Sequence, residues 1–147
     1  FDEIITQFGI EKIKTIGDAY MCAAGLPEPS DTHASDMVRA ALAMQHKTAV
    51  INQHKTAAGQ AILEMRIGMH TGAVIAGVVR KKKFAYDIWG DTVNIASRME
   101  SSGEVGQVNI SDTTYELVKD KFNCVHRGKI QAKGKGEIDM YFVESRI

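Results

Sequence analysis

Apolar and polar positions alternate near the start of the chain, which is the pattern of strands with one buried face. Residues 11–16 read Glu-Lys-Ile-Lys-Thr-Ile, and residues 19–24 resume an extended, mostly apolar pattern. Gly17 and Asp18 separate them and are turn-forming residues, so the segments predict a β-hairpin with Asp18 near its tip. A loop that contains both prolines follows at residues 26–31.

A helical repeat begins after this loop. Asp31 or Thr32 is expected to cap its first turn. Residues 1–8 resemble the end of another helix. The apolar positions predicted to face the core recur at helical spacing and are Met37, Ala41, Met44 and Ile51.

Strands and helices alternate in the rest of the chain. Gly90 interrupts the pattern, so Asp91 is expected to cap a helix and Trp89 to anchor the core. This order predicts an α/β or α+β fold in which helices cover a sheet. Strands are predicted at residues 65–70, 84–89, 107–110, 125–132 and 138–143, and helices at residues 92–101 and 113–119.

Composition limits the function classes. The 147 residues suit one domain, residues 1–147, and the net charge of zero argues against a nucleic-acid partner. Cys22 and Cys124 lack the spacing of a disulfide framework or zinc site, which fits a reducing, cytoplasmic compartment. No apolar run approaches the ~18 residues of a membrane span, so no direct membrane contact is expected.

Several polar residues lie where strands end and helices begin, which is where sites commonly form. Asp18 could hold a metal beside Gly17, although a turn aspartate bonded to its own backbone is commoner. Lys14 shares a strand face with Lys12 and is most simply a solvated lysine.

A second group of polar residues follows the predicted strand at residues 84–89. Asp87 lies at its end, and Asn94 and Arg98 are four residues apart, which places them on one face of the next helix. A solubilising helix face is the alternative explanation. Lys133 begins a Lys-Gly-Lys-Gly turn that suits phosphate contact or a flexible basic turn.

Taken in order, these segments closely match one family. The chain resembles the catalytic domain of class III nucleotidyl cyclases. The resemblance implies an α+β, ferredoxin-like sheet with helices on one side, working as a head-to-tail homodimer with active sites at its interface. The matching segments are residues 11–21 (EKIKTIGDAYM), 66–72 (RIGMHTG), 84–100 (FAYDIWGDTVNIASRME) and 133–136 (KGKG).

The resemblance also implies residue roles in an adenylyl cyclase, which converts ATP to 3′,5′-cyclic AMP and pyrophosphate. One protomer would supply Asp18 as a ligand of two divalent cations, Mg²⁺ or Mn²⁺. The partner would supply the other residues. By similarity, Lys14 and Asp87 recognise the base, Asn94 orients the ribose, Arg98 stabilises the transition state and Lys133 contacts the triphosphate.

Base choice follows from donors and acceptors. Adenine accepts at N1 and donates from its 6-amino group, which suits Lys14 and Asp87, whereas guanine reverses both groups. Guanylyl members typically have glutamate and cysteine at these positions, so ATP is the expected substrate. A guanylyl cyclase is a further alternative.

One family feature has no counterpart in the sequence. Family members carry an upstream strand with a pattern like Phe-x-Asp-Ile-x-Gly-Phe-Thr, which supplies the other metal aspartate. The domain is therefore expected to be incomplete at its N-terminal side, with unpaired sheet edges. With only Asp18, a cyclase-like module that binds nucleotide or dimerises without turnover is the main alternative.

Overall fold

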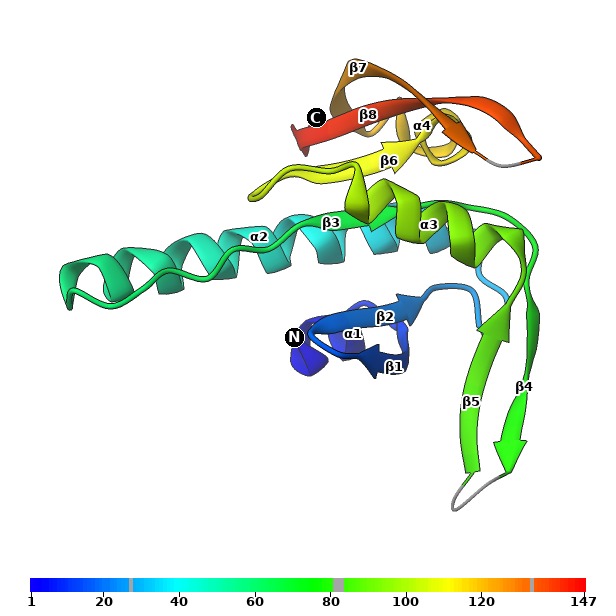
Figure 1. Cartoon of the computed structure of the whole chain (residues 1–147), viewed down its shortest axis with the longest axis horizontal. Helices are drawn as coiled ribbons and strands as arrows, with labels where there is room; N and C mark the ends of the chain where they lie inside the picture. The colour runs from blue at the N-terminus through cyan, green and yellow to red at the C-terminus, as the bar shows by residue number, and fades with distance from the viewer. Residues whose placement is uncertain (27, 81–83, 133) are drawn as a thin grey trace.

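The computed structural model describes residues 1–26, 28–80, 84–132 and 134–147. Figure 1 shows a long helix, α2, that passes behind β3 and below β6, β7 and β8, with one hairpin below the helix and another that projects at the lower right. In chain order the elements are α1 (Asp2–Gln7), β1 (Glu11–Ile16), β2 (Ala19–Ala23), α2 (His33–Ala57), β3 (Ile67–Met69), β4 (Ile75–Arg80), β5 (Phe84–Trp89), α3 (Asp91–Ser101), β6 (Val108–Ser111), α4 (Asp112–Val118), β7 (Phe122–Ala132) and β8 (Gly136–Arg146).

The described strands form three separately hydrogen-bonded groups. The largest is a four-stranded sheet in the order β3-β6-β8-β7, in which only β3 and β6 run parallel. β1 pairs with β2, and β4 pairs with β5, each as an antiparallel hairpin. In the described part of the chain, no backbone ladder joins the first hairpin to the four-stranded sheet.

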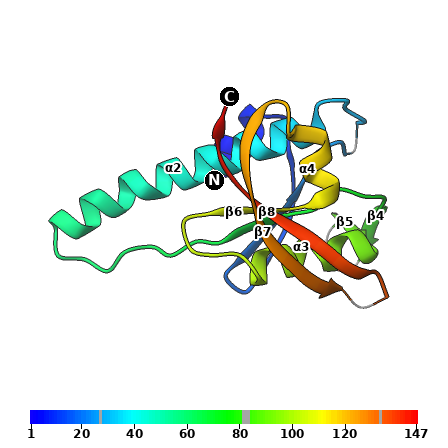
Figure 2. The ribbon, with the colours of Figure 1, turned by 90° about the horizontal axis from the view of Figure 1, so that it is seen from above.

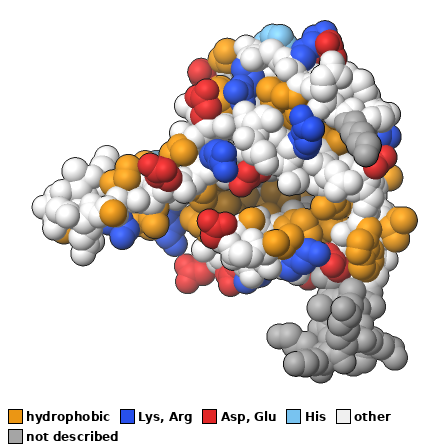
Figure 3. Space-filling model, viewed as in Figure 1, with side chains coloured by type: hydrophobic (Ala, Val, Ile, Leu, Met, Phe, Trp, Pro, Cys, Tyr) orange, Lys and Arg blue, Asp and Glu red, His pale blue; other side chains and the backbone are white. Residues whose placement is uncertain are grey.

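Apolar packing holds the first hairpin beside the sheet instead. Ile5 and Ile10 are buried in a cluster with Met44 of α2. Cys22 of β2 and Ile67 of β3 pack against the same cluster. Figure 3 shows apolar side chains at the bottom of a hollow in this face of the molecule.

The helices divide between the two faces of the four-stranded sheet. Side chains alternate across a strand, and β6 directs Val108 and Ile110 into a core with α2 and α4. Met140 of β8 instead joins Met99 of α3 in a second cluster. The view from above agrees, with α3 on the opposite side of the strands from α2 and α4 (Figure 2). The α+β class is confirmed, but the helices are not all on one side.

Three details differ from the sequence predictions. Thr32 is the residue before α2, but its hydroxyl donates to the Asp36 carboxylate (2.8 Å) and caps no backbone amide. Asp91 is the first residue of α3, because Gly90, with φ +124°, takes the N-cap position. Trp89 is 43% exposed, because the β4–β5 hairpin projects from the body of the molecule (Figure 1) and is not buried in its core.

Other predicted elements are confirmed. The strand at residues 84–89 and the hairpin around Asp18 have the predicted positions, while β7 and β8 are longer than predicted. β3 is shorter and begins at Ile67. Within the described residues, no helix combines the length and apolar character needed to cross a membrane.

Candidate active site

Lys14 and Asp87 form an ion pair between the first hairpin and β5. The Lys14 ammonium lies 2.8 Å from Oδ2 of Asp87 and donates a hydrogen bond to it. The residues are 73 positions apart in the chain, so the pair depends on the packing of β1 against β5. The structure thus brings together the two residues predicted to recognise a base.

A β-bulge separates Lys14 from its neighbour Lys12. The register of β1 against β2 shifts between these two lysines, which leaves Ile13 as the extra, buried residue. A bulge re-aims the side chains beside it. Lys12 consequently pairs with Asp2 (3.5 Å) and only Lys14 reaches Asp87. The prediction that both lysines share one strand face is wrong for this reason.

Asp87 is the more buried member of the pair. Its side chain is 15% exposed, against 41% for Lys14, and its Oδ1 accepts from the Ile88 amide at 2.8 Å. The hydrogen bond from Lys14 is the main cause that lowers the pKa of the Asp87 carboxyl, which therefore stays ionised at neutral pH. The ion pair therefore stabilises the folded chain at any pH above the pKa that this carboxyl has in the unfolded chain. This stabilisation is lost as the pH falls through the lower pKa that the carboxyl has in the folded chain.

Asn94 and Arg98 lie on the exposed face of α3. Ile95 and Met99 of the same helix are buried, which agrees with the prediction that Asn94 and Arg98 share one face. In the described part of the chain, the Arg98 side chain has no hydrogen bond or ion pair. Its guanidinium is therefore available to an external anion.

The start of α3 is fixed to the loop after β3. The Thr92 hydroxyl donates to the Ala73 carbonyl at 2.6 Å. A Cβ atom on Gly72 would approach that hydroxyl to 2.5 Å, so only glycine fits there without a shift. This contact sets the first turn of the helix that carries Asn94. Sequence reasoning missed Thr92, because a threonine near a helix start is common and has no distinctive spacing.

Asp18 is exposed at the tip of the β1–β2 hairpin, next to Gly17 at φ +59°. Among the described residues, its carboxylate has no hydrogen-bond or ion-pair partner. Lys133 lies outside the described residues. Lys135 of the same turn pairs with Asp91 at 3.3 Å.

A divalent cation would need oxygen ligands at Asp18. Mg²⁺ is commonly held by one or two carboxylates together with substrate phosphates and water, so a free, exposed carboxylate suits one ligand position. Within the described ranges, no group of three His, Cys, Asp or Glu side chains is placed to hold a metal. Asp18 could therefore supply one carboxylate ligand to a divalent cation, but the described residues do not form the expected site for two ions.

Large apolar side chains are exposed around the Lys14–Asp87 pair. Ile16 at the end of β1 is 60% exposed, and Ile75 and Trp89, which are register partners in the β4–β5 hairpin, are 70% and 43% exposed. Exposed apolar groups that gather beside a polar site are typical of surfaces that another protein covers.

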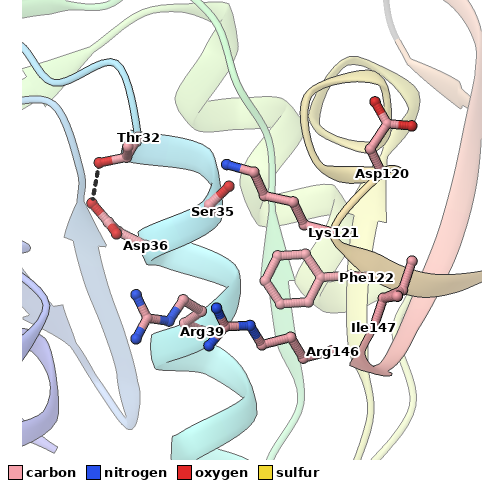
Figure 4. A pocket seen from close by; sticks show the side chains of 9 residues that line it. All are labelled: Thr32, Ser35, Asp36, Arg39, Asp120, Lys121, Phe122, Arg146 and Ile147. Carbon is pink, nitrogen blue, oxygen red and sulfur yellow. Dashed lines mark hydrogen bonds between the residues drawn. The ribbon is translucent and has the colours of Figure 1, made fainter.

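A separate pocket of about 350 Å³ lies at the start of α2. Figure 4 shows Arg39 and Arg146 among the side chains that line it, together with the hydrogen bond between Thr32 and Asp36. The lining contains none of the predicted site residues. The candidate site is therefore the open surface around the Lys14–Asp87 pair and α3, not this pocket.

Comparison with known proteins identifies the family. Residues 1–145 match the adenylate and guanylate cyclase catalytic domain. An adenylate cyclase of Mycobacterium tuberculosis is 44% identical over 99% of this chain and 32% of its own length. The guanylate cyclase soluble subunit beta-2 of Rattus norvegicus is 42% identical over 97% of this chain and 21% of its own length. The chain thus spans about a third or less of these relatives.

A solved structure supports the same assignment. The catalytic core of a rhodopsin-guanylyl cyclase with converted specificity, in complex with ATPαS, is 39% identical and has a TM-score of 0.89. The alignment covers 99% of this chain and 77% of that one. The chain belongs to the class III adenylyl and guanylyl cyclase catalytic domains. Because both types are similar to it, the family alone does not define the base.

Proposed function

We propose that this domain converts ATP to 3′,5′-cyclic AMP and pyrophosphate at sites between two copies of the chain. The observation that carries the choice of ATP is the contact between Lys14 and Asp87. A donor beside an acceptor complements adenine N1 and its 6-amino group, and it opposes the reversed groups of guanine. In support, the similar catalytic core of a rhodopsin-guanylyl cyclase with converted specificity was solved in complex with ATPαS.

The remaining residues act on the sugar and phosphates in this proposal. Asn94 orients the ribose so that its 3′-hydroxyl attacks the α-phosphorus in line with the departing pyrophosphate. Arg98 presents a planar, bidentate donor to the phosphoryl oxygens as negative charge builds on them. Lys133 contacts the triphosphate. A divalent cation bound by Asp18 and the phosphates would neutralise charge on the reacting oxygens.

Dimer formation completes each site. Asp18 of one protomer serves the nucleotide that is held by Lys14, Asp87, Asn94, Arg98 and Lys133 of the other. The exposure of Ile16, Ile75 and Trp89 supports this arrangement, since a second copy would bury these side chains. A closed two-fold dimer of this kind contains two equivalent sites.

The direct test is product formation from each nucleotide with Mg²⁺ or Mn²⁺ present. We expect cyclic AMP, with kcat/KM for ATP roughly 100-fold or more above that for GTP, because the wrong base leaves charged groups unpaired. Cyclic GMP as the main product would establish a guanylyl cyclase instead. Nucleotide binding without either product would favour the module that lacks turnover, which the single carboxylate at the metal position suggests.

A further inference from the structure

We infer that Asn109 is a positioning residue for Arg98. Asn109 lies on β6, and its side-chain amide binds the backbone of α3 at Met99, the residue directly after Arg98. The inference rests on the proposed function, because it concerns where the Arg98 guanidinium stands when a phosphate is bound. Asn109 itself is buried and contacts no substrate.

The hydrogen bond satisfies a carbonyl group at the end of a helix. The last carbonyls of a helix lack intrahelical donors and need other partners. Near the end of α3, Ser102 N–H donates to the Arg98 carbonyl at 2.9 Å, while Gly103 N–H donates to Glu100 at 3.0 Å. The Met99 carbonyl between them accepts from Nδ2 of Asn109, at 2.9 Å. Asn109 therefore caps the last turn of α3 from the neighbouring sheet.

The burial of Asn109 makes this bond specific. Its side chain is fully buried, and Oδ1 has no hydrogen-bond partner among the residues described. An unpaired buried amide oxygen is unfavourable for stability. An apolar side chain of similar size would avoid that penalty. The feature that distinguishes asparagine from such an apolar residue here is therefore the amide N–H that it donates to α3.

Contacts from other strands also fix this turn of α3. A Cβ atom on Gly68 of β3 would lie 2.0 Å from the Glu100 amide nitrogen, so strand and helix backbones are in direct contact. Arg127 of β7 donates to the Ser102 carbonyl at 2.6 Å, where a cation also complements the helix dipole. The end of α3 is thus held by three strands, while Arg98 projects from its exposed face.

The consequence concerns turnover more than binding. A misplacement of about 1 Å in a reacting group can lower a rate by about 100-fold. Lys14 and Asp87, which contact the base, lie on β1 and β5, and β5 leads into the first turn of α3, not into the last turn that Asn109 holds. Loosening the end of α3 should therefore reduce kcat and leave KM for ATP nearly unchanged.

The test is Asn109→Leu in the protein form that shows cyclase activity. We expect kcat to fall about 10-fold and KM to stay within about 2-fold, as for loss of an interaction made mainly in the transition state. Asn123→Leu is the matched control, since Asn123 is exposed and its amide donates to Ser145 at 3.0 Å, away from α3. This control should retain full activity.

A double-mutant comparison separates positioning from general damage. In an Arg98→Ala background, Asn109→Leu should cause no further loss of kcat, because the group that it positions is already absent. An equal loss in both backgrounds, or wild-type kcat in Asn109→Leu, would overturn the inference. If the leucine variant does not fold, Arg127→Gln takes its place, with the same kcat-only loss expected and unchanged kcat as the contrary result.

Amide hydrogen exchange gives a readout that needs no activity. Asn109→Leu should accelerate exchange of the Ser102 and Gly103 amides, since their turn loses a partner. Unchanged exchange would contradict the capping role even if the domain proved inactive. Absence of any cyclic nucleotide from the wild type, together with faster exchange in the variant, would refute the proposed function and leave the structural contact intact.

Discussion

Exchanging Lys14 for glutamate together with Asp87 for cysteine is expected to move the preference from ATP to GTP. The new pair would accept from guanine where Lys14 donated to adenine, and the ion pair at 2.8 Å would be removed as a unit. The substitutions reverse the donor and acceptor roles at both positions, where the original residues make charge-assisted hydrogen bonds to adenine. The ratio of kcat/KM for ATP to kcat/KM for GTP should therefore shift by roughly 100-fold or more. Initial rates with both nucleotides measure this shift.

The single exchange Lys14→Glu should behave differently. It would place a second carboxylate beside Asp87, which is already held by the Ile88 amide and only 15% exposed. Two adjacent carboxylates repel, so one of them would be protonated or displaced. We expect loss of ATP turnover without gain of GTP turnover. The pair must therefore be changed together.

Lys12→Glu is the matched control for this charge change. Lys12 lies on the same strand but pairs with Asp2 and not with Asp87. Its substitution should leave base preference unchanged. If the double variant kept the wild-type preference, Lys14 and Asp87 would not be the residues that read the base.

Replacing Arg98 with alanine should give the largest loss of turnover. Removal of one preorganised donor to a developing anion typically lowers kcat by about 100- to 1,000-fold. KM should change little, because the contact strengthens as charge builds. Thermal unfolding should be unaffected, since Arg98 is exposed and its side chain has no partner in the part of the chain described. Steady-state kinetics and a melting curve measure both.

Arg98→Lys distinguishes charge from geometry. Lysine keeps the charge but lacks the planar fork, so it should recover only part of the activity. Arg39→Ala controls for the loss of an exposed helical arginine, because Arg39 lies on α2 and faces a different pocket. An Arg98→Ala variant with unaltered kcat would remove the guanidinium from the proposed reaction.

Local patterns predicted most of the secondary structure. The hairpin around Asp18 and the strand before Gly90 have short-range signals in alternation and turn residues. The exposure of Trp89 had no such signal, because it follows from how far the β4–β5 hairpin projects. The bulge at Ile13 likewise depends on the packing of β1. Alternation alone therefore wrongly placed Lys12 and Lys14 on the same face of the strand.

The candidate site was predictable only through the order of motifs. Asp87, Asn94 and Arg98 each have an ordinary explanation when considered separately. Asn109 could not be predicted at all, because an asparagine in a short strand gives no indication that α3 lies against it. The four buried residues of β6 are packed on both faces, which is a tertiary property.

The central claim is that each site combines residues of two protomers, and mixing two inactive variants tests it most directly. Asp18→Asn and Arg98→Ala should each lack activity alone. When they are mixed in equal amounts and allowed to exchange subunits, half of the dimers are mixed, and each contains one intact site. The account predicts recovery of about a quarter of wild-type activity in a closed two-fold dimer. If mixed dimers are shown to be present and no activity is recovered, the claim is contradicted. A site formed entirely within one chain would be defective in both variants, so mixing them would restore nothing.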